Sequence, residues 1–163
     1  MLPLQFNNRV ALRSCNRPAI ETLFTHFPEK ITCASEEGFR RVYDSEYAKN
    51  AKNIVYLFRC EKNISRLKGE SNIIYIGQTK YSFNKRYHPH AKLHATSEAN
   101  SLKFSHIIEN YGPISISISD FSKFGENILQ AEGQLLWWYF QNHCEYPPVN
   151  YTKTKIRNSV VCV

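Results

Sequence analysis

The chain has 163 residues and a formal net charge of +7, and both values limit what it can be. Its length fits one domain, since a typical domain takes roughly 100 to 200 residues. Apolar residues make up 42% and aromatic residues 13%, a globular composition that excludes a disordered or collagen-like chain. The 21 Lys and Arg against 14 Asp and Glu favour a polyanionic partner, with nucleic acid first and an anionic membrane surface second.

Neither a membrane span nor an export signal is indicated. The longest apolar run, 135–140, is far shorter than the roughly 18 residues that cross a bilayer. The first ten residues lack the basic flank and apolar stretch of a secretory signal. The 5 cysteines are odd in number and none stands in a C-x-x-C pair, which argues against a disulfide framework and a thiolate zinc cluster. We therefore expect a cytoplasmic protein.

Residues 1–52 are predicted to be a helical extension without a chemical motif. Asn16 and Pro18 are suited to cap and begin a helix over 19–27. Ser35 would cap a second helix that runs towards Tyr43.

From Asn53 onward the pattern predicts a small sheet. Two β-rich runs, 54–58 and 72–76, flank a polar stretch that contains Gly69, so we expect antiparallel neighbours. A strict alternation of Ile and Ser over 114–119 predicts a third, half-buried strand.

Three helices are predicted around these strands. The first, over 82–91, is expected to be disturbed by Pro89. The second spans 100–110 and stops before Gly112, and the longest spans 126–143.

These elements give an α+β class: a small antiparallel or mixed three-stranded sheet flanked by helices. The core would occupy 53–151, between the helical extension at 1–52 and a basic tail at 152–163.

Glu132 breaks the pattern of the longest helix. At about 100° per residue, Leu135, Leu136 and Tyr139 fall within roughly 60° of it, so the carboxylate lies in the apolar stripe. A carboxylate buried there without a partner costs several kcal/mol, and it requires a cation, a metal ion or a raised pKa. The alternative is that Glu132 reaches the edge of the core or pairs with a structural arginine.

In this order the motifs resemble the GIY-YIG nuclease superfamily. The second half of its signature is intact, and the first half keeps its Tyr but has lost its Gly. The five matching elements are Ile54-Val55-Tyr56, Tyr75-Ile76-Gly77, Arg86, Glu132 and Asn150. The resemblance covers about 53–151 and implies a GIY-YIG-like core.

Two features depart from the family. The spacing between Tyr56 and Tyr75 is longer than usual, which predicts a longer hairpin or a loop insertion at 61–71 that is a candidate DNA contact. Many members carry a His one helical turn after the Arg. His90 has this spacing, but Pro89 disfavours helical geometry before it, so His88 is a substitute candidate.

The resemblance implies a divalent-metal-dependent endonuclease that hydrolyses phosphodiester bonds in double-stranded DNA. Glu132 would hold one Mg²⁺ or Mn²⁺ per active site, and Arg86 would bind the phosphate. Tyr56, assisted by Tyr75, would take the proton of the attacking water, and His90 is a further catalytic candidate. Because a phenol has a pKa near ~10, the site is expected to lower it.

Other residues are expected to support the site. Gly77 would let the backbone turn and approach closely, and Asn150 would hold the tail by hydrogen bonds. A basic surface for DNA would come from Lys80, Lys85, Lys92 and Lys103. Any sequence specificity, of a restriction or mobile-element kind, is expected from residues 1–52, from the insertion at 61–71 or from the basic tail. Double-strand cutting would favour a homodimer.

Several alternatives stay open. The histidines His88, His90 and His94 have a spacing that could seat zinc. Trp137 and Trp138 point to different helix faces; at least one is expected in the core, and an exposed one would mark a protein interface or stack on a base. The chain could also be an inactive nucleic-acid-binding protein of the same fold, or an unrelated basic interaction protein.

Overall fold

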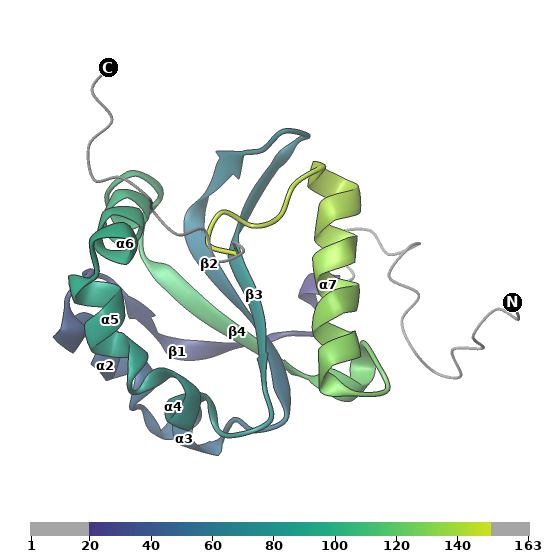
Figure 1. Cartoon of the computed structure of the whole chain (residues 1–163), viewed down its shortest axis with the longest axis horizontal. Coiled ribbons are helices and arrows are strands. Elements are labelled where there is room, and N and C mark those ends of the chain that lie inside the picture. Colours follow the sequence, from purple (N-terminus) through teal and green to yellow (C-terminus); the bar gives the residue numbers. More distant parts are fainter. Residues whose placement is uncertain (1–19, 151–163) are drawn as a thin grey trace, which may run out of the picture.

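A four-stranded antiparallel sheet forms the centre of residues 20–150, the part of the chain that the computed structural model describes (Figure 1). The strands are β1 (Thr25–Ile31), β2 (Ile54–Ser65), β3 (Glu70–Thr79) and β4 (Ile114–Asp120). They are ordered β1-β4-β2-β3, so β3 is an edge strand. The α+β class is confirmed, with one strand more than the three that were expected.

The extra strand, β1, takes the last three residues of the helix predicted over 19–27, so this prediction is wrong from Thr25 onward, whereas Ile20 and Glu21 are helical. Phe27 and Ile31 are its buried positions, and the strand pairs with β4. Pro28 explains the outcome, because proline disfavours a helix interior and is tolerated on an edge strand. It lies where the register with β4 shifts, between His26 and Lys30.

The helices match the predicted ones more closely. Ser35 caps α2 as expected, its hydroxyl accepting from Gly38 N at 3.0 Å. Pro89 separates two short helices where one was predicted. The helices are α2 (Glu36–Tyr43), α3 (Glu46–Asn50), α4 (Phe83–Tyr87), α5 (His90–Thr96), α6 (Glu98–Tyr111) and α7 (Ile128–His143), with a short 3₁₀ helix, η1 (Phe121–Lys123).

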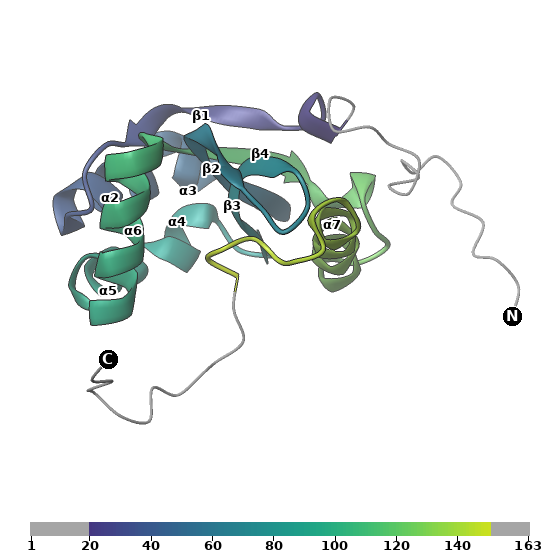
Figure 2. The ribbon, with the colours of Figure 1, turned by 90° about the horizontal axis from the view of Figure 1, so that it is seen from above.

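Different helices cover the two faces of the sheet (Figure 2). Side chains alternate along β2, so Tyr56 and Phe58 enter the core under α2 to α6. Val55 and Leu57 enter the second core, under α7. Trp138 is buried in this second core and Trp137 is exposed, which confirms that the two tryptophans point to different faces.

The insertion at 61–71 extends the hairpin of β2 and β3. The two strands pair as far as Ser65 and Glu70, and Gly69 adopts a positive φ of 67° in the turn. The tip is fixed to the end of α7, because Lys68 N donates to His143 O at 3.1 Å and Lys68 O lies 2.9 Å from His143 Nδ1.

Candidate active site

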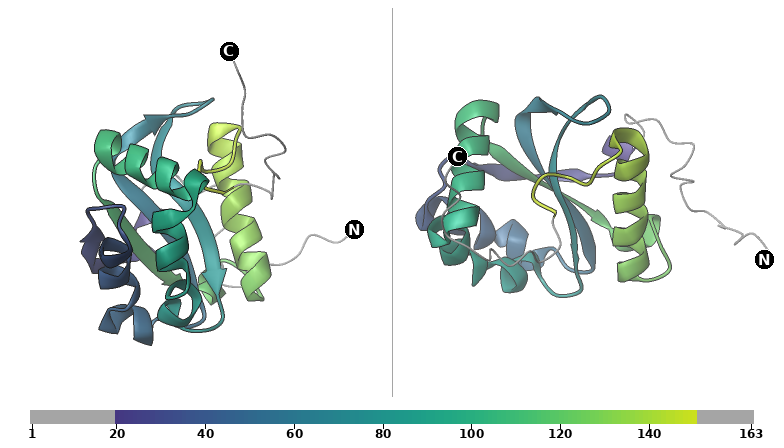
Figure 3. Two further views of the ribbon diagram at one scale, coloured as in Figure 1. Left: turned by 60° about the vertical axis from the view of Figure 1, so that its left-hand side comes forward. Right: turned by 45° about the horizontal axis from the view of Figure 1, so that its top comes forward.

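One cavity of about 400 Å³ brings together four of the expected site residues. Tyr75, Arg86, His90 and Asn150 all line it. They come from the edge strand β3, from α4, from the start of α5 and from the segment that follows α7. This segment crosses β3 (Figure 3), and Val149 N donates to Ile74 O at 2.8 Å.

Asn150 holds this segment on the edge of the sheet. Its Oδ1 accepts from Ile76 N at 2.7 Å, and its Nδ2 donates to Ile76 O at 2.8 Å. The side chain therefore satisfies both backbone groups of an edge residue, as a neighbouring strand would. The expected hydrogen-bonding role of Asn150 is confirmed.

Tyr56 lies deeper than Tyr75. Its side chain is 1% exposed, and its hydroxyl accepts a hydrogen bond of 2.9 Å from the hydroxyl of Tyr87, a residue also buried. The rings of Tyr56 and Tyr75 stack with centroids 6.1 Å apart. Tyr75 is the member of this pair that lines the cavity.

Gly77 makes room for the phenol of Tyr56. The two residues are paired across β2 and β3, and a Cβ on Gly77 would lie 2.6 Å from the Tyr56 hydroxyl. The expected close approach is present. The expected turn is not, because Gly77 lies within β3.

The described residues do not lower the pKa of either tyrosine as expected. Burial raises the pKa of Tyr56, and the nearby Tyr75 adds to the effect. Burial also raises the pKa of Tyr75. Hydrogen bonding by Tyr87 and the charge of Arg86 lower both values, but desolvation is the larger effect.

Arg86 lies at the centre of the charge interactions in the site. It is exposed, one residue before Tyr87 on α4, and its charge acts to lower the pKa of Tyr56. Its charge also acts on Tyr75 and on Glu132. A guanidinium so placed can donate hydrogen bonds to a phosphate from its exposed side, while its positive charge favours the ionised form of the nearby phenols.

Glu132 approaches the same place from the other face of the sheet. It is half-buried on α7, which packs on the edge strand β3. Burial raises the pKa of Glu132, and Arg86 partly offsets this. Within residues 20–150 its carboxylate makes no hydrogen bond or close ion pair, so its oxygens can bind a cation.

A single carboxylate of this kind fits a hard divalent ion that keeps most of its water ligands. No group of three or more His, Cys, Asp or Glu side chains that could enclose a metal occurs in the described part of the chain. Among residues 20–150, Glu132 is therefore the carboxylate that would hold such an ion.

The three histidines do not gather into a zinc site. His88 Nδ1 lies 2.8 Å from Asp44 Oδ1, and His94 Nδ1 lies 3.0 Å from the hydroxyl of Tyr43. His88 therefore does not line the cavity, and it is a poor substitute for His90. Burial and the charge of Arg86 lower the pKa of His90, so a neutral imidazole faces the cavity.

The four lysines have different surroundings. Lys80, Lys85 and Lys92 are exposed, and the ammonium of Lys85 lies 4.4 Å from the ring centre of Tyr81. Lys103 is half-buried and donates to Pro148 O at 3.3 Å, a contact that ties α6 to the segment before Asn150. Lys103 therefore contacts a segment distant in the sequence, whereas Lys85 contacts a neighbouring side chain, Tyr81.

Tyr87 was not among the residues predicted for the site. As a tyrosine next to Arg86 it looked like an ordinary helix residue. Its spacing of four from the buried Phe83 is a signal that it faces the core, and the two rings stack with centroids 4.5 Å apart.

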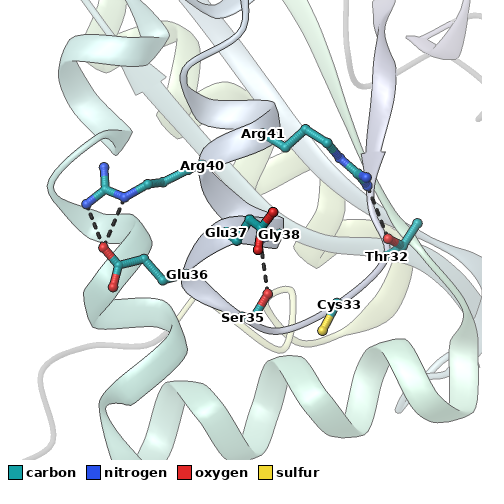
Figure 4. A pocket seen from close by; sticks show the side chains of 8 residues that line it. All are labelled: Thr32, Cys33, Ser35, Glu36, Glu37, Gly38, Arg40 and Arg41. Atoms are coloured by element: carbon teal, nitrogen blue, oxygen red, sulfur yellow. Dashed lines mark hydrogen bonds and ion pairs between the residues drawn. The ribbon is translucent and has the colours of Figure 1, made fainter.

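A second, larger cavity of about 820 Å³ lies at the start of α2 and contains none of the expected site residues (Figure 4). Its polar groups pair with one another. Arg40 Nη2 lies 2.8 Å from Glu36 Oε1, and Arg41 Nη2 donates to Thr32 Oγ1 at 3.1 Å. Four of the expected site residues are found at the smaller cavity and none at this one.

No family model, curated protein or solved structure matches the chain. Among the helices of residues 20–150, none has the length and apolar character needed to cross a membrane.

Proposed function

We propose that the chain is a divalent-metal-dependent endonuclease of the GIY-YIG type, which hydrolyses phosphodiester bonds in double-stranded DNA. One observation carries the proposal: Tyr75 and Arg86, from β3 and α4, line one cavity, and Glu132 on α7 lies near enough to raise the pKa of Tyr75. A carboxylate and a phenol are rarely half-buried beside a guanidinium for structural reasons alone, because burying the carboxylate costs free energy.

In this proposal Arg86 binds the scissile phosphate through its planar donors as negative charge develops. Tyr75 is the phenol that reaches the cavity, so it is the better candidate to accept the proton of the attacking water. Tyr56 is too deeply buried to contact that water and would instead hold Tyr75 through ring stacking. Lys80, Lys85 and Lys92 would bind the flanking backbone.

Glu132 would hold the Mg²⁺ or Mn²⁺ ion. Such an ion, when bound, supplies positive charge for the phosphoryl and leaving oxygens. The sequence specificity of the enzyme and its place in restriction, or in a mobile element, are parts of the proposal that rest on the resemblance alone.

The test is cleavage of a supercoiled plasmid in Mg²⁺ and in EDTA. We expect Mg²⁺-dependent cutting by the wild type and none by Glu132→Gln. Arg86→Lys keeps the charge but loses the planar fork, and it should cut at least ~10-fold more slowly. Glu109→Gln, an exposed carboxylate on α6, is the matched control and should cut normally.

A second candidate is an inactive DNA-binding protein of the same fold. The raised pKa of both tyrosines favours it, because a protonated phenol is a poor base. Plasmid binding without cutting by the wild type, at all metal concentrations, would support this candidate and contradict the enzyme.

A further inference from the structure

Asn100 carries a carboxamide that makes no hydrogen bond within residues 20–150. The residue is half-buried in the first turn of α6, where its backbone N–H donates to the hydroxyl of Ser97 at 3.4 Å. It lines the cavity of about 400 Å³, as Arg86 does. Partial burial removes water from an amide, so a ligand that hydrogen-bonds this carboxamide would offset the cost of its burial.

Arg86 and Asn100 approach the cavity from different sides of α5. Arg86 belongs to α4 and Asn100 to α6, and α5 packs between these two helices (Figure 1). A ligand that contacts both residues must therefore extend across α5. The volume of about 400 Å³ lies in the range of sites that take a whole small molecule, and a single phosphate group fills only a part of it.

The side of α5 that faces the cavity is uncharged. His90, Leu93 and His94 line the cavity, and their spacing of three and four residues from His90 puts them on one face of the helix. Leu93 is 49% exposed, and the two imidazole rings have centroids 5.7 Å apart. Burial lowers the pKa of both histidines, so both rings are neutral at pH 7. This surface has no cation for a second phosphate, and it suits a flat aromatic ring.

We propose that the cavity holds one whole nucleotide, with its phosphate on Arg86, its sugar and base against α5, and the edge of its base hydrogen-bonded by Asn100. This inference rests on the proposed function, because the phosphate is the one that the nuclease would attack. A carboxamide offers a donor and an acceptor side by side, as the edge of a base does, whereas a phosphate only accepts.

A base bound in this cavity cannot stay stacked in a duplex. Extruding a paired nucleotide costs free energy, and the cost is smallest where the base is already mismatched or single-stranded. The preferred substrate is therefore DNA with an unpaired nucleotide at the cut. Asn100 would contact this nucleotide without taking part in the proton transfer.

The test is binding to the full chain in EDTA, followed by calorimetry, with three kinds of ligand: inorganic phosphate, deoxyribose 5-phosphate and each of the common deoxynucleoside 5′-monophosphates. We expect at least one nucleotide to bind about 5-fold or more tightly than deoxyribose 5-phosphate, as hydrogen bonds to a base would give. Arg86→Gln should weaken the binding of every ligand, because all of them share the phosphate.

Asn100→Ala should remove the preference for the nucleotide and leave the binding of deoxyribose 5-phosphate unchanged. The variant should fold normally, by circular dichroism, because Ala favours a helix and no side-chain hydrogen bond is lost. Asn110→Ala is the matched control. It removes an exposed asparagine near the other end of α6 and should keep the preference.

Equal binding of nucleotides and deoxyribose 5-phosphate by the wild type overturns the inference, and so does a preference that survives Asn100→Ala. A wild type that binds none of the ligands in the millimolar range also overturns it. These measurements need neither metal nor cleavage. A chain that prefers the nucleotide but never cuts plasmid would contradict the enzyme and keep the nucleotide site, whereas Mg²⁺-dependent cutting without the preference would contradict the nucleotide site alone.

Discussion

The hydroxyl of Tyr87 donates a hydrogen bond of 2.9 Å to the hydroxyl of Tyr56, and both side chains are buried. This bond joins α4, which carries Arg86, to the central strand β2. It fixes the helix that presents the guanidinium against the strand that supports Tyr75.

Removing this bond should affect activity more than stability. Tyr87→Phe keeps the ring and its packing, so the free energy of unfolding should fall by only about 1 kcal/mol. The cleavage rate should fall about 10-fold or more, because Arg86 and the tyrosines lose their common anchor. Urea unfolding and single-turnover plasmid cleavage measure the two effects.

The control for Tyr87→Phe is Tyr139→Phe, which removes a buried hydroxyl on α7 whose oxygen lies 3.5 Å from Ile73 O. It should lower stability to a similar extent and leave cleavage nearly unchanged. Equal losses of cleavage in the two variants would show that Tyr87 acts only through general stability.

A methyl group at Gly77 should displace the phenol of Tyr56. The new Cβ would lie 2.6 Å from that hydroxyl and 2.7 Å from two ring carbons, so the ring or the strand must move. Gly77→Ala should cost about 1 to 3 kcal/mol, the range for overpacking a core.

The matched variant is Gly133→Ala, where the same methyl group meets nothing within 4 Å. It should stabilise the helix by up to about 1 kcal/mol. Urea midpoints that shift in the same direction for both variants would contradict the steric explanation.

Much of this arrangement follows from local patterns. The helical periodicity around Glu132 predicted a carboxylate among apolar residues. In the structure Glu132 is half-buried and its pKa is raised. The alternation over 114–119 predicted β4 correctly. Such features depend on residues close in the sequence, which is why they could be recognised.

Other features depend on contacts between distant segments. The burial of Tyr56 results from α4 packing over β2, and no pattern near residue 56 indicates it. β1 forms because it pairs with β4, and this distant contact overrides the prediction that the helix continues to residue 27. Asn16 and Pro18, like the basic tail 152–163, lie outside the described residues.

Glu132 should make the protein less stable as the pH rises. Its pKa is raised in the folded state from an ordinary value of 4.5, so the unfolded chain loses its proton first. The resulting destabilisation is absent below about pH 4.5 and complete above the folded pKa. Glu132→Gln should therefore unfold at a higher temperature than the wild type at pH 7, and the difference should vanish at pH 4.

A metal ion should reverse the difference in unfolding temperature between the wild type and Glu132→Gln at pH 7. If Glu132 binds Mg²⁺ or Mn²⁺, millimolar metal should raise the unfolding temperature of the wild type and not that of Glu132→Gln. Equal shifts in the two proteins would mean that the metal binds elsewhere. This measurement detects the site even in a chain that does not cut DNA.

His94 should make the fold sensitive to acid. Burial, with a contribution from His90, lowers the pKa of His94 from 6.5 to about 4, and its ring packs at a tilt against Phe104, with centroids 4.9 Å apart. The unfolded chain takes up the proton first as the pH falls, so the stability that the neutral ring provides at pH 7 is lost between pH 6.5 and 4. The slope is at most about 1.4 kcal/mol per pH unit.

His94→Phe keeps an aromatic ring but cannot be protonated, so its unfolding free energy should fall less steeply between pH 6.5 and 4. Because the Phe ring loses the bond to Tyr43, the variant starts lower at pH 7, and the slope with pH is the quantity to compare. Parallel curves for the two proteins would assign the acid sensitivity to other groups.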